Sequence, residues 1–189
     1  MGVAPALRGW PSDDDLRAVD VFLTRAAHDP RRRTREGLVL GLQAAGERDG
    51  PRLLALGERW MASGDAYLMR AVIAMLVQPP TLARDVTAGA ALRHAKTAID
   101  WLQGQPAARR FTEGGKILTE ALGSALSVYV VAAPGPGLEL LDDLLAGGDR
   151  ATRRIVNANL GDARLVKAHP TLVTRLKGWI HEMDDWQRG

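Results

Sequence analysis

The chain has 189 residues, of which 46% are hydrophobic and 25% are charged. It is too apolar to be disordered, and its formal net charge of +3 is well below that of a dedicated nucleic-acid-binding protein. The absence of cysteine excludes disulfides and thiolate metal sites and favours a cytoplasmic location. Residues with high helix propensity dominate, whereas aromatic residues make up only 5%, so we expect an all-α fold. No run approaches the roughly 18 apolar residues of a membrane-spanning helix, so we expect no membrane partner.

Capping signals predict two helix pairs in the first part of the chain. Ser12 and the three aspartates after it cap a helix that ends near His28, and Asp29-Pro30 opens a second helix that ends around Gly46. Asp49-Gly50-Pro51 and Asp65 then open the two helices of a second pair. These signals predict repeat units at 12–48 and 49–78.

The middle of the chain predicts a longer unit, at 81–133. After Pro79-Pro80, one long helix or two helices broken near Gly89 run from Leu82 to Gln103, and a poorly defined connector follows. A strongly apolar helix then begins at Lys116. Because its apolar residues lie on every side, we expect it to be buried between neighbouring helices.

The last third predicts one more pair and a terminal helix. Pro134-Gly135-Pro136-Gly137 predicts a loop, after which Leu138 to Leu145 form a short outer helix. Asp149 caps an inner helix, which completes a unit at 136–169. Pro170 opens a final helix, predicted to cap the array at 170–186.

One short sequence pattern, which we call the repeated phrase, occurs four times along the chain. Its copies begin at Thr34, Tyr67, Leu118 and Thr152, and each has an apolar residue or alanine four positions later and a large apolar residue eight positions later. The first and last intervals between copies match the period of about 33 residues that is typical of stacked helix pairs. A unit of that size cannot bury its apolar face alone, so the repeats are expected to stack into a solenoid.

These segments resemble the HEAT and armadillo superfamily, in which an outer and an inner helix alternate. The matching segments are Asp29 to Leu42, Asp65 to Met75 and Asp149 to Leu160, and the last of them is similar to the closing repeat of bacterial HEAT-like proteins, including relatives of the alkylpurine DNA glycosylases. The resemblance implies a right-handed α-solenoid of about four antiparallel helix pairs plus a C-terminal capping helix, with residues 1–189 as a single domain. The third unit departs from the pattern, because Gly114-Gly115-Lys116 stands where an Asp-led turn is expected.

Arginines near the starts of inner helices are the candidate partner-binding residues, because a solenoid presents successive inner helices along one concave wall. In the family that the chain resembles, the arginine after the capping Asp often pairs with a carboxylate of the adjacent repeat, and this favours an internal role for Arg35 and Arg153. The other candidates are harder to explain as such pairs. The complete set is Arg31, Arg32, Arg33, Arg35, Arg70, Arg109, Arg110, Arg153 and Arg154.

The sequence favours a non-enzymatic module that binds a protein partner along the concave face. The alternative is a glycosylase-like module that binds nucleic acid by contacting phosphates through arginine. The Trp and Asp that such glycosylases carry one helical turn apart are matched only by Trp10 and Asp14, near a helix start, where we interpret them as capping residues. The histidines lack zinc-site spacing, and no phosphate loop or nucleophile elbow is present, so we expect no catalytic residues, no metal and no cofactor.

Overall fold

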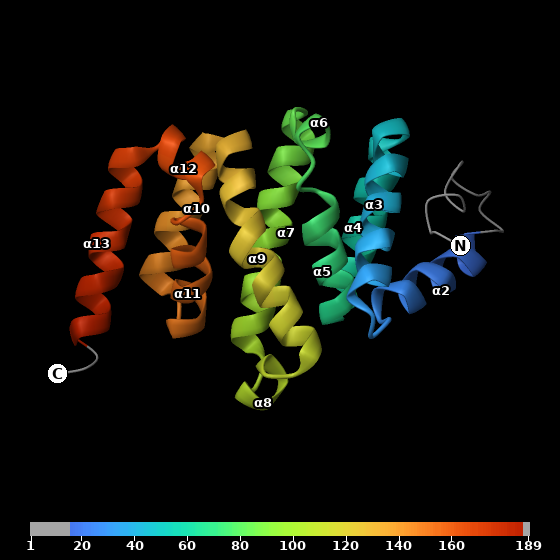
Figure 1. Ribbon diagram of the computed structural model, residues 1–189, viewed down its shortest axis with the longest axis horizontal. Helices are drawn as coiled ribbons and strands as arrows, with labels where there is room; N and C mark the ends of the chain where they lie inside the picture. Colours follow the sequence, from blue (N-terminus) through green and yellow to red (C-terminus); the bar gives the residue numbers. More distant parts are fainter. Residues whose placement is uncertain (1–15, 187–189) are drawn as a thin grey trace.

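The computed structural model describes residues 16–186, and within this range the protein is all-α, with no strand. Helix α2 (Leu16–Ala27) lies at one end of the long axis of the molecule and α13 (Pro170–Trp186) at the other (Figure 1). The predicted cap at Ser12 lies outside the described residues. The helices are α2 (Leu16–Ala27), α3 (Arg32–Arg48), α4 (Gly50–Ala62), α5 (Ala66–Met75), α6 (Pro79–Leu82), α7 (Asp85–Gly104), α8 (Ala107–Arg110), α9 (Glu113–Ala132), α10 (Pro134–Gly147), α11 (Arg150–Asn159), α12 (Ala163–Ala168) and α13 (Pro170–Trp186).

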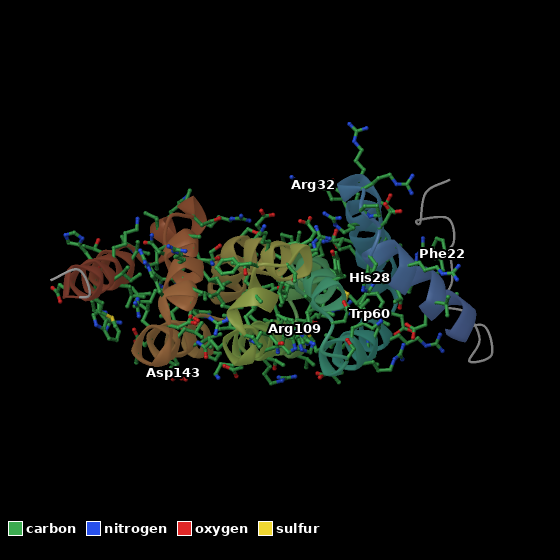
Figure 2. The ribbon with its side chains drawn as sticks, turned by 90° about the horizontal axis from the view of Figure 1, so that it is seen from below. Phe22, His28, Arg32, Trp60, Arg109 and Asp143 are labelled. Carbon is green, nitrogen blue, oxygen red and sulfur yellow. The ribbon has the colours of Figure 1, made fainter. Side chains whose placement is uncertain are left out.

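From α3 to α11, apart from the short helices α6 and α8, successive helices alternate between two rows. We call α3, α5, α9 and α11 the inner row, because each carries one copy of the repeated phrase, and α4, α7 and α10 the outer row. In the inner row α3 packs on α5, α5 on α9 and α9 on α11, and in the outer row α4 packs on α7 and α7 on α10. Figure 2 shows the two rows on opposite sides of the molecule, with Arg32 projecting from the inner-row side and Asp143 on the outer-row side. The four copies of the phrase therefore lie on helices that are neighbours in space.

Helix α9 is the central helix of the molecule, packed against α5, α7, α10, α11 and α12. Leu118, Leu122, Leu126 and Tyr129 on this helix are completely buried. By its length and apolar composition it could cross a membrane, but half of its apolar stretch is buried against its neighbours. Its apolar composition is therefore explained by its central position, as its sequence predicts.

Aspartate caps begin several helices where the sequence predicts them. The Asp65 carboxylate accepts hydrogen bonds from the backbone N–H of Tyr67 (2.9 Å) and Leu68 (3.1 Å) at the start of α5. The Asp149 carboxylate accepts one from Thr152 (2.9 Å) at the start of α11. Each bond satisfies a helix N–H that has no intrahelical partner.

Two of the predicted connections are wrong. The segment Pro134-Gly135-Pro136-Gly137 is the first turn of α10, which follows α9 after one residue. Proline is tolerated in that turn because N–H groups there have no intrahelical acceptor to lose. The poorly defined connector contains the short helix α8, which covers the start of α9.

The two glycines where the third unit departs from the pattern are explained by close packing. A Cβ atom at Gly115 would lie 2.5 Å from the Arg110 carbonyl oxygen, and one at Gly114 would lie 3.1 Å from the Tyr67 ring. Thr112 takes over the role of the missing aspartate, since its hydroxyl accepts from the Gly115 N–H at 3.3 Å. The glycines thus let α8 and α5 approach the start of α9.

We predict that Gly115→Ala destabilises the fold by about 1–3 kcal/mol, because the added methyl group collides with backbone that cannot move aside. The matched control is Gly37→Ala, within α3, where an added Cβ meets nothing within 4 Å. This control should stabilise the protein by about 0.5–1 kcal/mol through helix propensity. Urea unfolding followed by circular dichroism measures both, and equal effects of the two variants would contradict the proposed packing.

Polar side chains join neighbouring helices of the inner row. The Gln43 side-chain amide of α3 donates to the Ala74 carbonyl at 3.1 Å, and the Tyr129 hydroxyl of α9 donates to the Ile73 carbonyl. Both acceptors lie in the last turn of α5, and the Ala74 carbonyl also accepts from the Val77 N–H at 3.5 Å. Burial raises the pKa of Tyr129, which keeps its hydroxyl a donor. The end of α5 is thus capped by its two neighbours.

Asn159 joins α11 to α9 in the same manner. Its side-chain NH₂ donates to the carbonyls of Leu122 (2.9 Å) and Ile155 (2.8 Å), and its side-chain oxygen accepts from the Ser127 N–H at 2.8 Å. The side chain is completely buried. The side-chain amide of Asn159 thus supplies the two donors and the one acceptor of these three hydrogen bonds.

Candidate binding face on the inner row

A groove of about 330 Å³ opens between α3, α5 and α9, and we call it the arginine groove. Three of the nine candidate arginines line it, namely Arg32 and Arg35 from α3 and Arg70 from α5. Helix α9 supplies the opposite wall, including Glu120 and the exposed Ser124. The remaining lining residues are Gln43, Ala74, Val77, Ile117, Ala121 and Ala125.

Arg35 and Arg70 form the cationic centre of the groove. Arg35 is 7% exposed, and its guanidinium donates to the carbonyls of Asp29 (2.8 Å) and Pro30 (3.1 Å). The carboxylate of Glu113, at the start of α9, is 3.9 Å from it. Arg35 therefore has an internal role, but the carboxylate near it belongs to the third unit and not to the adjacent repeat that the prediction named.

Of the three arginines in the groove, Arg70 is the one whose positive charge is least neutralised by a nearby carboxylate. Its guanidinium makes one long hydrogen bond, 3.4 Å to the Arg35 carbonyl, and among the described residues no carboxylate lies within ion-pair distance of it. Burial, followed by the positive charge of Arg35, lowers the pKa of Arg70, and the carboxylates of Glu36 and Glu120 offset this only in part. A half-buried cation next to a second cation, facing a cavity, is an arrangement that an anionic group stabilises.

The first three candidate arginines are exposed at the start of α3. Arg31 is bound to Asp29 through two hydrogen bonds of 2.9 and 2.7 Å, and these hold the pKa of Asp29 well below its usual value. Arg32 pairs with Glu36 one turn later at 2.7 Å and projects beyond the inner row (Figure 2). Arg33 is exposed but does not line the groove. Only Arg32 of the three therefore belongs to the arginine groove.

Arg110 and Arg109 differ sharply in role. The Arg110 guanidinium donates to the carbonyls of Gln103 (2.6 Å) and Gln105 (3.0 Å) and also binds the Asp149 carboxylate, so its hydrogen bonds hold the fold together. Arg109 is exposed and lines a separate cavity, to which His28 also contributes; both residues are labelled in Figure 2. Neither reaches the arginine groove.

The last two candidates lie on α11. Arg153 is 5% exposed and donates to the Gly148 carbonyl at 3.1 Å, which is an internal role. Arg154 is exposed and lines a second cavity of the inner row. The nine arginines thus do not converge on one surface.

The second cavity, which we call the apolar pocket, has a volume of about 380 Å³ and lies between α9 and α11, beside α8. Ile99, Leu102 and Ile155 contribute apolar side chains, and Phe111, which is 72% exposed, stands at its edge. Lys116 and Arg154 add positive charge. Glu120 lines both this pocket and the arginine groove, so the two cavities flank the same face of α9.

The apolar pocket and the α9 wall of the arginine groove were not anticipated from the sequence. The signal for Glu120 and Ser124 was available, because they lie two and six residues after the start of the third repeated phrase, on the exposed side of a predicted inner helix. The apolar pocket had no such signal, since it needs α7, α8, α9 and α11 to meet. The predicted pair of Trp10 and Asp14 lies outside the described residues.

Comparison with known proteins does not place the chain in a family. No protein family model, no curated protein and no solved structure matches it.

Proposed function

We propose that this protein is a right-handed, HEAT-like helical-repeat module that binds a polypeptide partner along the exposed face of its inner row. The observation that carries the proposal is the arginine groove, where the under-compensated Arg70 faces a cavity between three inner helices. The alternation of two packed rows supports the repeat architecture, because it follows the order that stacked helix pairs require.

The use of the arginines favours a polypeptide over nucleic acid. Arg35, Arg110 and Arg153 make hydrogen bonds within the fold, and Arg31 and Arg32 pair with carboxylates of their own segment. A phosphate backbone is bound by a run of available cations, because each neutralised phosphate adds to the affinity. A groove with one under-compensated arginine suits a single carboxylate better, because the neighbouring Glu120 repels additional negative charge.

Selection of peptides tests this function. A library of random peptides is panned against the protein, and the affinities of the recovered peptides are measured for the parent and for Arg70→Glu. We expect a loss of at least about tenfold in affinity, since hydrogen bonds between charged groups contribute about 1.5–3 kcal/mol. Arg93→Glu is the matched control, because it makes the same charge change on an exposed residue of the outer-row helix α7.

Three outcomes would contradict the proposal. They are a library that yields no binder, recovered peptides that bind Arg70→Glu as tightly as the parent, and equal losses in Arg70→Glu and Arg93→Glu. Duplex and single-stranded oligonucleotides at low salt complete the test. Tight oligonucleotide binding that weakens steeply with salt and is lost in Arg70→Glu would replace a polypeptide with nucleic acid as the partner.

A further inference from the structure

The arginine groove and the apolar pocket lie on either side of one helix and share a residue. Glu120 of α9 lines both cavities, with Arg70 on the α5 side and Ile155 on the α11 side. Packed helices have axes about 8–10 Å apart, so two cavities that flank one helix are separated by about that distance. One ligand can therefore fill both cavities if it crosses α9.

The two cavities differ in the chemistry that they accept. The arginine groove has three arginines, of which Arg32 and Arg35 have carboxylates nearby, at 2.7 and 3.9 Å. This leaves the charge of Arg70 to be balanced, which suits one carboxylate better than a doubly charged phosphate. The apolar pocket is walled by Leu102 and Ile155 and edged by the exposed ring of Phe111, so it suits an aliphatic or aromatic side chain.

We infer that the polypeptide bound by the inner row crosses α9 in a polyproline II conformation, with an Asp or Glu side chain in the arginine groove and an apolar side chain in the apolar pocket, three residues apart. A polyproline II segment has three residues per turn and advances about 3.1 Å per residue, so side chains three residues apart lie on the same face about 9 Å from each other, which matches the separation of cavities across one helix. The Glu120 carboxylate lies beneath the residues between them and disfavours a further acidic residue there. This inference rests on the proposed function and specifies the ligand of the same face.

The peptides that lose affinity for Arg70→Glu provide the first test. We expect them to share an acidic and an apolar residue at a separation of three, with no acidic residue between. Peptides that depend on Arg70 but lack this pairing would overturn the inference and leave the proposed function intact. Peptides that do not depend on Arg70 at all would overturn both.

Double-mutant cycles on one such synthetic peptide assign each side chain to its cavity. Replacing the acidic residue by its amide should weaken binding to the parent about tenfold, and should have little further effect in Arg70→Gln. Replacing the apolar residue by alanine should likewise weaken binding about tenfold, with a smaller effect in Phe111→Ala. Additive effects in both cycles would contradict the assignment of the two side chains.

The control for the apolar cycle is Val86→Ala, on α7. Val86 and Phe111 are both 72% exposed, so neither truncation should disturb the core. If Val86→Ala reduces the affinity loss caused by truncating the apolar peptide residue as much as Phe111→Ala does, the apolar side chain does not bind in the apolar pocket. Moving the two peptide residues one position closer or one position further apart should lower the affinity, and unchanged affinity would contradict the crossing of α9.

Discussion

Replacing Asn159 with leucine is expected to lower the free energy of unfolding by about 2–4 kcal/mol, because it removes the three hydrogen bonds of a completely buried amide. The change removes an acceptor from the Ser127 N–H and a donor from the Leu122 carbonyl, both on the central helix α9. Leucine is close to asparagine in size, so the loss reports on hydrogen bonding more than on packing. Urea unfolding followed by far-ultraviolet circular dichroism measures the difference.

Asn157→Leu is the matched control for this variant. Asn157 lies on the same helix but is exposed, so the same chemical change should alter stability by no more than about 0.5 kcal/mol. A midpoint of Asn159→Leu equal to that of the parent would show that the amide does not join α11 to α9.

The second large effect is expected from Arg110→Ala, which should lower the free energy of unfolding by about 1–3 kcal/mol. The guanidinium binds the Gln103 and Gln105 carbonyls near the end of α7 and the Asp149 carboxylate that caps α11, so its removal loosens two helix ends at once. The matched control is Arg109→Ala, the exposed neighbour, which should unfold at nearly the urea concentration of the parent. Equal losses in the two variants would contradict the role assigned to Arg110.

The contribution of the Arg110 contact to Asp149 should depend on pH. Burial opposes ionisation of Asp149, but hydrogen bonds from the Thr152 N–H and Arg110 outweigh it and hold the pKa of Asp149 below the usual 3.8. A lowered pKa means that the stabilisation is present above pH 3.8 and is lost as the pH falls through the pKa of the folded protein. The stability difference between the parent and Arg110→Ala should therefore shrink under strongly acidic conditions, and a difference that grows would contradict this ion pair.

The order of helices in this fold was predictable from local signals. Asp65 and Asp149 cap the helices that they were expected to cap, because capping depends on residues two or three positions apart. The burial of α9 was also predictable locally, because its own sequence has apolar residues on every side of the helix. Pro134 and Pro136 were misread because proline within a first helical turn has the same local signature as proline in a loop.

The binding face was only partly predictable, because it depends on contacts between distant segments. Arg110 and Arg70 look alike in sequence, yet the first caps helices and the second faces a cavity. Which role an arginine has is decided by the carbonyls and carboxylates that the fold brings near it. For the same reason, the position of Glu120 between two cavities could not be predicted, because it depends on the packing of α5 and α11 on either side of α9.

The central claim is that a polypeptide docks on the inner row, and site-directed crosslinking tests it most directly. The chain contains no cysteine, so one introduced thiol is a unique attachment point for a photoreactive group. A selected peptide should crosslink to the protein labelled at Ser124→Cys, in the arginine groove, and not at Asp143→Cys, on the outer-row side (Figure 2). Crosslinking from Asp143→Cys with none from Ser124→Cys would contradict the account.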